Sequence, residues 1–311
     1  MASFYKRYGG CVLSAAINKY MYISVHPSFD PAQTALKYSK TEIVENIDDI
    51  EHVYFKRILR NLGIRGVELV STADIPAQTG LGSSSAFTVG VLHALYAYLG
   101  RSVSKELLAS EACDVEISQL GNPIGKQDQY AAAYGGFNFI EFRKDGSVSV
   151  EPVVMSESRL HELESNLMMF YTGRLRSASE ILKEQNENIS HGDKDANLLR
   201  MCELARELRD ALQKDNIDAM GEILKLNWEM KKTLASNITN PSIDGAYSKA
   251  LEAGAIGGKL LGAGGGGFLL FYVPIEKQTD VKTALSLPLL PVRFDYEGST
   301  LILSGTQSGL I

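Results

Sequence analysis

The sequence predicts an α+β protein built from two domains. Its 311 residues are enough for two domains that each have a hydrophobic core. In the first half, strand-like segments such as residues 67–71 are interspersed with helix-like segments such as residues 86–99. The second half opens with an apolar strand at residues 167–171 and continues with amphipathic helices. We therefore expect the domains to span residues 1–165 and 166–311.

Composition and charge narrow the possible functions. Hydrophobic residues make up 45% of the chain and charged residues 22%, as in a globular protein, and no apolar run is long enough to span a bilayer. The first residues are polar and contain two tyrosines, unlike a secretory signal. A formal net charge of −6 disfavours a nucleic-acid partner. We expect a cytoplasmic enzyme or small-molecule sensor, a monomer or homodimer without membrane or nucleic-acid partners.

The cysteines and histidines predict neither a disulfide framework nor a metal site built from these two residue types. Cys11, Cys113 and Cys202 are odd in number and widely spaced, and they lack the spacing of zinc ligands. The five histidines form no cluster in the sequence.

Local patterns predict the elements of the first half. Residues 11–16 and 20–25 have the composition of strands, and residues 52–62 have the pattern of a helix. Ser104 is placed to cap a further helix, and that helix carries Glu116.

The second half shows apolar positions at helical spacing. The stripes are Leu198, Cys202, Ala205, Leu208 and Leu212, followed by Ile217, Met220, Leu224 and Trp228. We interpret them as core, so Trp228 receives no functional role. Residues 268–273 predict a strand, and residues 293–296 and 301–304 predict a closing hairpin.

The segment from Pro76 to Ala86, with the sequence PAQTGLGSSSA, is the most informative in the chain. It connects a predicted strand to a predicted helix. Two glycines and three serines at a helix start place free backbone N–H groups and hydroxyls around one small concavity. The positive end of the helix dipole points into the same concavity. A phosphate is the natural occupant, so this turn predicts a nucleotide site.

A simpler explanation of this turn is also open. Serine and glycine are ordinary residues at helix starts, and most such turns bind nothing. No Lys-Ser/Thr pair follows the glycines, so the turn is not a Walker loop, and it lacks the third glycine of a dinucleotide fingerprint. Any phosphate would be held by N–H groups and serine hydroxyls.

A second glycine cluster occupies residues 262–267, with the sequence GAGGGG. It contains G-x-G-x-x-G, but a strand is predicted after it, whereas a dinucleotide site needs a helix there. It is either a tight turn between closely passing backbones or a backbone that approaches a phosphate loop or substrate.

Two carboxylates can complete a site for phosphoryl transfer. That reaction needs a magnesium ion held by oxygen ligands, a phosphate cradle and a carboxylate that aligns the attacking hydroxyl. Each carboxylate alone has a simpler explanation, because a loop aspartate is usually solvated or capping and a helical glutamate usually lies on the surface. Considered together with the serine turn, Ser84, Glu116 and Asp128 predict the metal ligands and the base.

These segments resemble the motifs of the GHMP kinases, the family of galactokinase, homoserine kinase, mevalonate kinase and phosphomevalonate kinase. The family's second motif, P-x-x-x-G-L-G-S-S-A-A, matches residues 76–86, with Ser85 where alanine is usual, and its glycine-rich third motif matches residues 259–267. Within the family, the chain most resembles the bacterial D-glycero-D-manno-heptose 7-phosphate kinases. The supporting stretches are residues 9–13, 37–42, 125–129, 171–173 and 257–259.

The resemblance implies a two-domain GHMP kinase fold. The N-terminal, ATP-binding domain would be like the second domain of ribosomal protein S5, and the C-terminal domain would be ferredoxin-like. ATP and Mg²⁺ would be the cofactors, and Asp128 would receive or orient the proton of the sugar hydroxyl. The ATP phosphates would be bound by Gly80, Leu81, Gly82, Ser83, Ser84 and Ser85. Magnesium would be held by Ser84 and Glu116.

The implied acceptor is a small-molecule sugar phosphate. The resemblance predicts transfer of the γ-phosphoryl group to the anomeric hydroxyl of D-glycero-D-manno-heptose 7-phosphate, with Gly264 and Gly265 bordering the acceptor. A phosphorylated acceptor requires cations near the site, and arginine binds phosphate through two hydrogen bonds. The candidates are Arg174, Arg176, Lys126 and Lys259, each of which is otherwise a solvated surface charge.

One part of the family pattern has no match in this sequence. The family's first motif precedes the segment that matches residues 8–10, and residues 1–7 do not resemble it. We therefore expect the first strand and an acceptor-binding loop to be missing from the chain as given, and turnover to be weak or absent.

Two other functions stay open at this point. One is a GHMP kinase for an unphosphorylated sugar such as fucose or galactose. The other is a non-catalytic sensor that binds sugar and nucleotide. RNA binding through an S5-like fold is disfavoured by the negative net charge.

Overall fold

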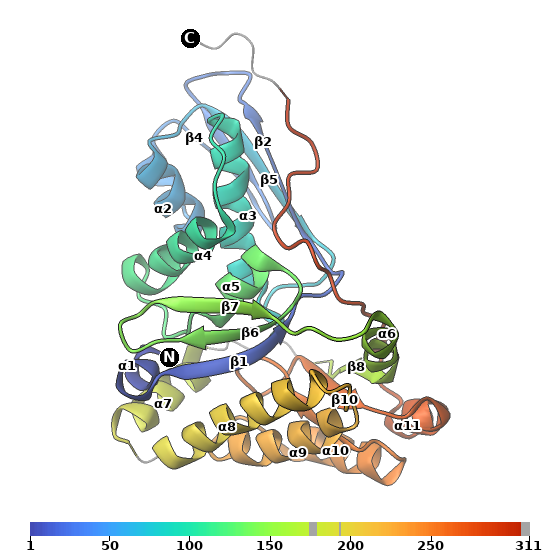
Figure 1. Ribbon diagram of the computed structural model, residues 1–311. Helices are drawn as coiled ribbons and strands as arrows, with labels where there is room; N and C mark the ends of the chain where they lie inside the picture. Colours follow the sequence, from blue (N-terminus) through green and yellow to red (C-terminus); the bar gives the residue numbers. More distant parts are fainter. Residues whose placement is uncertain (174–178, 193, 306–311) are drawn as a thin grey trace. The chain divides into compact units, whose positions relative to one another are not determined.

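The computed structural model describes residues 1–173, 179–192 and 194–305. The chain forms two compact units, each assembled from several segments. Unit 1 consists of Met1–Asn18, Ala77–Leu81 and Phe137–Phe294. Unit 2 consists of Lys19–Pro76, Gly82–Gly136 and Asp295–Ile311. Both units mix helices and strands, which confirms the α+β class (Figure 1). The division between residues 165 and 166 stays a prediction.

Unit 2 is built on a four-stranded sheet with the order β2-β5-β3-β4. Its strands are β2 (Met21–Pro27), β3 (Thr34–Lys37), β4 (Thr41–Val44) and β5 (Val67–Ala73). β5 pairs antiparallel with β2 and parallel with β3, and β3 pairs antiparallel with β4. In β5, Val67 and Leu69 are fully buried and Glu68 between them is not, as expected for side chains that alternate between the faces of a sheet.

The helices of unit 2 pack on this sheet and on one another. They are η1 (Ile47–Asp49), α2 (Val53–Leu62), α3 (Ser83–Tyr98), α4 (Lys105–Cys113), the π-helical η2 (Asp114–Gln119) and α5 (Gln127–Tyr134). α2 matches the sequence prediction: Phe55 N donates to His52 Nδ1 at its start, and Gly63 ends it with a φ of +65°. α3 packs on β2 (Figure 1).

Unit 1 contains two antiparallel sheets. The first has the order β1-β6-β7 and consists of β1 (Gly10–Ala15), β6 (Phe137–Phe142) and β7 (Val148–Pro152). The second has the order β11-β8-β10-β9 and consists of β8 (Leu167–Tyr171), β9 (Gly257–Leu260), β10 (Phe268–Tyr272) and β11 (Leu289–Leu290). β8 has the bounds that its apolar run predicted.

Unit 1 also holds a group of helices packed on these sheets. They are α1 (Ala2–Tyr8), α6 (Glu157–Asn166), α7 (Ser179–Ser190), α8 (Asp195–Leu212), α9 (Ala219–Lys232), α10 (Pro241–Glu252), η3 (Ile275–Lys277) and α11 (Gln278–Leu285). Most of the predicted apolar stripes of α8 and α9 are core, since Leu212 and Trp228 are fully buried. α9 lies very close to β9, because a β-carbon at Gly257 would be 2.0 Å from Gly221 O.

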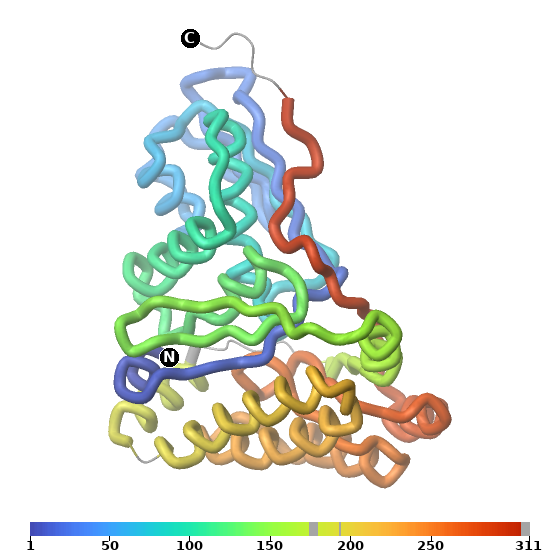
Figure 2. The backbone as a smooth tube through the Cα atoms, in the orientation of Figure 1, coloured from blue at the N-terminus to red at the C-terminus, as the bar shows by residue number. Residues whose placement is uncertain are grey.

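The prediction of a closing hairpin near the end of the chain is wrong. Phe294 makes one isolated bridge with Ile17, and residues 297–305 contain no strand. Figure 2 shows this red segment as a single extended path that does not fold back. Tertiary contacts hold it instead: a β-carbon at Gly298 would be 2.4 Å from Gly135 N, and Ser299 Oγ lies 2.8 Å from His93 Nδ1. Packing within unit 2 therefore determines the conformation of this segment, and its strand-like sequence pattern does not.

No helix among the described residues is both long enough and apolar enough to cross a bilayer.

Candidate active site

The glycine- and serine-rich turn leads into the N-terminus of α3. This helix begins at Ser83 rather than at Ala86, with Gly82 as its N-cap at a φ of +71°. Side chains with a β-carbon rarely adopt that conformation, which accounts for the glycine. Within the described residues, no side chain caps the helix and no acidic residue occupies its first turn. The first N–H groups and the positive end of the helix therefore suit an anion.

Glu116 is the buried carboxyl group of the site. It is 0% exposed, although a helical glutamate is usually a surface residue. Its Oε2 lies 3.4 Å from Ser84 Oγ and 3.4 Å from Ser85 Oγ. Its Oε1 has no hydrogen-bond partner among the described residues. A buried oxygen in that state is costly unless a ligand or ion completes it.

The surroundings of Glu116 disfavour its charged form. Burial is the largest cause, and it raises the pKa of Glu116 from an ordinary value of 4.5 to about 7. The negative charge of Asp128 raises the pKa further, while the polar side chains of Gln129, Thr88 and Ser85 oppose this rise. A cation beside Glu116 would favour the ionised carboxylate.

The helix that carries Glu116 is not α-helical throughout. α4 passes into the π-helical η2, where Leu120 N donates to Val115 O five residues earlier. Val115 and Glu116 are both buried there. The sequence predicted a single α-helix, and π-helical turns of this kind are frequent at functional sites.

Asp128 stands next to the start of α3. It lies in the first turn of α5 and is exposed. A β-carbon at Gly82 would be 3.4 Å from both Cβ and Cγ of Asp128, so the carboxylate flanks the phosphate-binding turn predicted from the sequence. The structure thus brings Ser84, Glu116 and Asp128 together within unit 2. The buried carboxyl can hold a cation, and the exposed carboxylate can receive a proton.

Tyr54 is a member of this group that sequence reasoning missed. Its Oη lies 3.0 Å from Ser84 Oγ and accepts a hydrogen bond of 2.8 Å from Asn122 Nδ2. Its ring packs edge-on against Phe87 of α3. Nothing in the local sequence of α2 signals this role, because the contact depends on how α2 packs against α3.

The two glycine clusters of the sequence meet within unit 1. A β-carbon at Gly262 would lie 2.5 Å from Gly80 Cα, and one at Gly267 would lie 2.2 Å from Thr79 O. Two backbones therefore pass in direct contact, as the sequence suggested. The roles of these glycines toward a ligand stay predictions.

The candidate residues for acceptor binding are spread over both units. Lys259 lies on β9, where its Nζ donates to Asn227 Oδ1 at 2.9 Å and burial lowers its pKa to about 8. Lys126 is the half-buried N-cap of α5 in unit 2. Gly264 and Gly265 lie between β9 and β10, and Gly265 N donates to Ile238 O. Arg174 and Arg176 fall outside the described residues.

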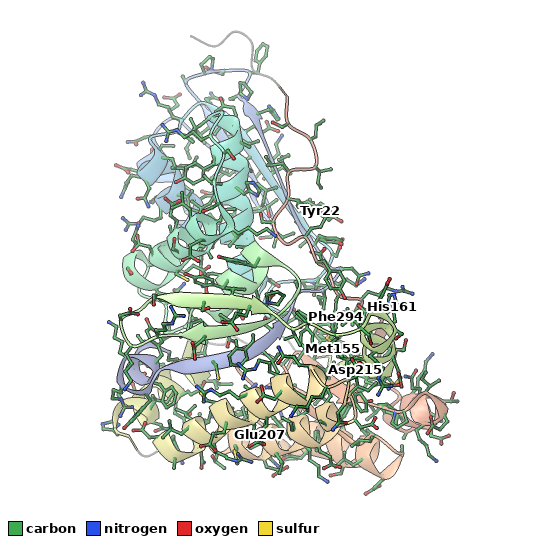
Figure 3. All side chains as sticks on the ribbon, in the orientation of Figure 1. Tyr22, Met155, His161, Glu207, Asp215 and Phe294 are labelled. Carbon is green, nitrogen blue, oxygen red and sulfur yellow. The ribbon has the colours of Figure 1, made fainter. Side chains whose placement is uncertain are left out.

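An open cavity of about 440 Å³ lies elsewhere in unit 1, beside α6. Its lining residues are His161, Glu164, Ser165, Val292 and Arg293. Figure 3 labels His161 on α6, with Phe294 beside it. Of the site residues predicted from the sequence, none that the structure describes lines this cavity.

Comparisons with known proteins show which families and proteins this chain is similar to. The models of the GHMP kinases N terminal domain and of the GHMP kinases C terminal domain match residues 50–136 and 208–286. The D-glycero-alpha-D-manno-heptose 7-phosphate kinase of Campylobacter jejuni is 29% identical over 292 residues, covering 90% of this chain and 86% of that protein. The galactokinase of Pyrococcus furiosus is 26% identical over 316 residues, covering 89% and 86%.

A comparison with solved structures also finds a sugar-phosphate kinase similar to this chain. The crystal structure of a D-glycero-D-manno-heptose 1-phosphate kinase from Bacteroides thetaiotaomicron has a TM-score of 0.73 and 27% identity, covering 94% of this chain and 90% of that one. The matched N-terminal segment contains Gly80 to Ser85, Glu116 and Asp128, and the matched C-terminal segment contains the second glycine cluster.

Proposed function

The chain belongs to the GHMP kinase family, and from that premise we propose that it phosphorylates the anomeric hydroxyl of D-glycero-D-manno-heptose 7-phosphate. That it is an ATP-dependent kinase acting on a hydroxyl follows from the family. The observation that carries the proposal is the placement of Asp128 beside the N-terminus of α3, with buried Glu116 beside Ser84. The choice of sugar is supported by the two heptose-phosphate kinases to which the chain is similar.

The turn before α3 would bind the phosphates of ATP. Ser83 and Ser84 are the first two residues of α3, and no described side chain caps the helix start. Its first backbone N–H groups would therefore bind phosphate oxygens, together with the two serine hydroxyls. Negative charge at such a position is stabilised by the helix dipole. The serines and backbone would therefore supply the cradle without a P-loop lysine.

Asp128 would orient the acceptor and take up its proton. Phosphoryl transfer depends mainly on positioning the attacking oxygen in line with the γ-phosphorus and on stabilising charge. The carboxylate is exposed and lies against Gly82, so it can approach a hydroxyl next to the bound phosphates. In accepting the proton of the hydroxyl, Asp128 would act as a general base.

Magnesium fits the oxygen atoms at Glu116 and Ser84. Glu116 Oε1 is buried without a partner among the described residues, and Ser84 Oγ lies beside Oε2. These are hard oxygen ligands of the type that Mg²⁺ prefers, with water and phosphate oxygens completing its shell. When bound, the ion offsets negative charge on the phosphates. The described residues contain no group of three or more His, Cys, Asp or Glu that could hold it alone.

A phosphorylated acceptor is supported by Lys259. Lys259 is the third residue of β9, the strand that leads into Gly264 and Gly265, and its ammonium group donates to Asn227 Oδ1. With a pKa of about 8, it is still predominantly charged at neutral pH. Arg174 and Arg176 stay proposals for the same role.

The test is a panel of acceptors with the purified chain, ATP and Mg²⁺, with ADP release as the readout. We expect the highest kcat/KM for heptose 7-phosphate, at least about 100-fold above heptose itself, because charge-assisted contacts to phosphate would be lost. Asp128→Ala serves as the control for contaminating kinases. An equal or higher kcat/KM for heptose, galactose or fucose would overturn the assignment of the acceptor.

A kinase for an unphosphorylated sugar is the second candidate. It is supported by the similarity to a galactokinase over most of this chain. The same panel separates the two, because galactose lacks the phosphate that would use Lys259. Binding of nucleotide without turnover on any acceptor would support neither assignment of the acceptor.

A further inference from the structure

We propose that Lys231 is a positioning residue for the ATP phosphates, because it fixes the glycine turn at residues 262–267 that packs against Thr79 and Gly80. No role for this lysine was predicted from the sequence. The inference rests on the proposed function in one respect, namely that the turn containing Gly80 binds phosphate.

Lys231 is a buried cation on α9 whose ammonium group contacts two backbone carbonyl groups. Its residue exposure is 8%, and Nζ donates to Leu260 O at 2.9 Å and to Gly262 O at 2.6 Å. Lysine is almost never buried unless its charge is compensated, because desolvation of an ammonium group is costly. Hydrogen bonds from a charged donor are about twice as strong as neutral ones. The side chain therefore acts as a fixed clamp between α9 and this part of the backbone.

The two carbonyl groups mark the point where a strand becomes a turn. Leu260 is the last residue of β9, and Gly262 is the first glycine of the cluster, at a φ of +67°. Between them, Leu261 N donates to Phe268 O at 2.9 Å. Lys231 thus sets the direction in which the chain leaves the sheet.

The end of the turn that Lys231 contacts packs directly against Gly80 of the predicted phosphate loop. A β-carbon at Gly80 would lie 3.1 Å from Leu261 O, and one at Gly262 would lie 2.5 Å from Gly80 Cα. Backbone meets backbone here with no side chain between them. Because packed interiors transmit small displacements, a shift at Gly262 would be felt at Gly80.

The far end of the turn has its own supports. Gly265 N donates to Ile238 O at 2.8 Å, and Thr172 N and Oγ1 both donate to Gly267 O at 2.9 Å. Loss of the Lys231 contacts would therefore loosen the turn at Gly262 while the remainder stays attached. This predicts an altered phosphate loop in a folded protein.

Lys232 provides a matched control on the same helix. Its Nζ, like that of Lys231, lies 6.0 Å from the centroid of the Trp228 ring. However, Lys232 forms a partly exposed ion pair with Glu229 at 2.8 Å. Lys232→Met removes the same charge and the same aromatic contact without touching the glycine turn.

The experiment compares wild type, Lys231→Met, Lys231→Gln and Lys232→Met as full chains. The measurements are Kd for a non-hydrolysable ATP analogue with Mg²⁺, the KM values for ATP and for the sugar acceptor, and Tm. For Lys231→Met we expect Kd and the KM for ATP to rise about tenfold, with the acceptor KM within about twofold. Lys231→Gln retains a donor and should lie between, while Lys232→Met should match wild type.

A purely structural role would lower Tm without this selectivity for ATP. The proposal is overturned if folded Lys231→Met binds the analogue as wild type does, or if both KM values rise equally. Should Lys231→Met fail to fold, Lys231→Gln decides by the same criteria. Failure of the wild-type chain to bind the analogue would overturn the proposed function together with this inference, whereas normal wild-type binding with unchanged variants overturns the inference alone.

Discussion

Asp128 lies against Gly82, the residue that caps α3 with a left-handed backbone conformation. A β-carbon at Gly82 would sit 3.4 Å from the Cβ and Cγ atoms of Asp128, and the φ of Gly82 is +71°. The carboxylate is thereby held next to the first N–H groups of the helix. One structural unit thus combines a helix start suited to anions with a carboxylate beside it.

Replacement of Glu116 by glutamine should stabilise the metal-free protein at alkaline pH. The folded state raises the pKa of Glu116 from 4.5 to about 7, so between these values it keeps a proton that the unfolded chain has released. The free energy of unfolding therefore falls as pH rises through this window, by on the order of 3 kcal/mol in total. Glu116→Gln removes this loss.

The check is Tm measured with a chelator present at pH 5 and pH 8. Glu116→Gln should exceed wild type by several degrees at pH 8 and by little at pH 5, while losing activity. An equal difference at both pH values would contradict the assigned environment of Glu116.

Removal of the Tyr54 hydroxyl should weaken the use of magnesium. Tyr54→Phe deletes the oxygen that lies 3.0 Å from Ser84 Oγ and leaves the ring packed on Phe87. We expect the Mg²⁺ concentration for half-maximal activity to rise about three- to tenfold, with a loss of stability near 1 kcal/mol. Tyr22→Phe, at a 41% exposed position on β2, is the matched control. Identical magnesium titrations for the two variants would argue against Tyr54 as a support of Ser84.

The acceptor preference should depend on pH through Lys259. Burial lowers its pKa to about 8, so it is charged below that pH and neutral above it. If it contacts the acceptor phosphate, kcat/KM for the phosphorylated sugar should fall as pH rises through 8, because this ratio reports the free enzyme. Lys259→Arg, whose side chain stays charged, should remove the fall. A wild-type profile that is flat to pH 9 would exclude this role.

The sequence was sufficient for elements whose signals are local. β8 has the predicted bounds, and α2 spans Val53–Leu62 where a helix was predicted over residues 52–62. The helix predicted over residues 86–99 begins earlier, at Ser83, because Gly82 with its positive φ is the N-cap and the serines form the first turn. The closing hairpin failed because contacts of Gly298 and Ser299 override the apolar pattern.

The site could be predicted only where its residues fall in motifs. Glu116 and Asp128 were predicted because their chemistry accompanies the serine turn. Tyr54 and Lys231 were not, since their partners lie 30 residues from Tyr54 and 29 and 31 residues from Lys231 along the chain. Moreover, Lys231 contacts backbone carbonyl groups, which carry no sequence signature.

The most direct test of the account is kcat for Asp128→Ala beside wild type, with the Kd of an ATP analogue measured on the same preparations. Asp128 is exposed, so we expect the alanine variant to fold. Loss of a base that also orients the acceptor predicts a fall in kcat of about 10²- to 10⁴-fold. The Kd should stay within about threefold, because the backbone N–H groups and serine hydroxyls that would bind the phosphates are unchanged in the variant. A kcat within a few-fold of wild type would contradict the placement of the chemistry at Asp128.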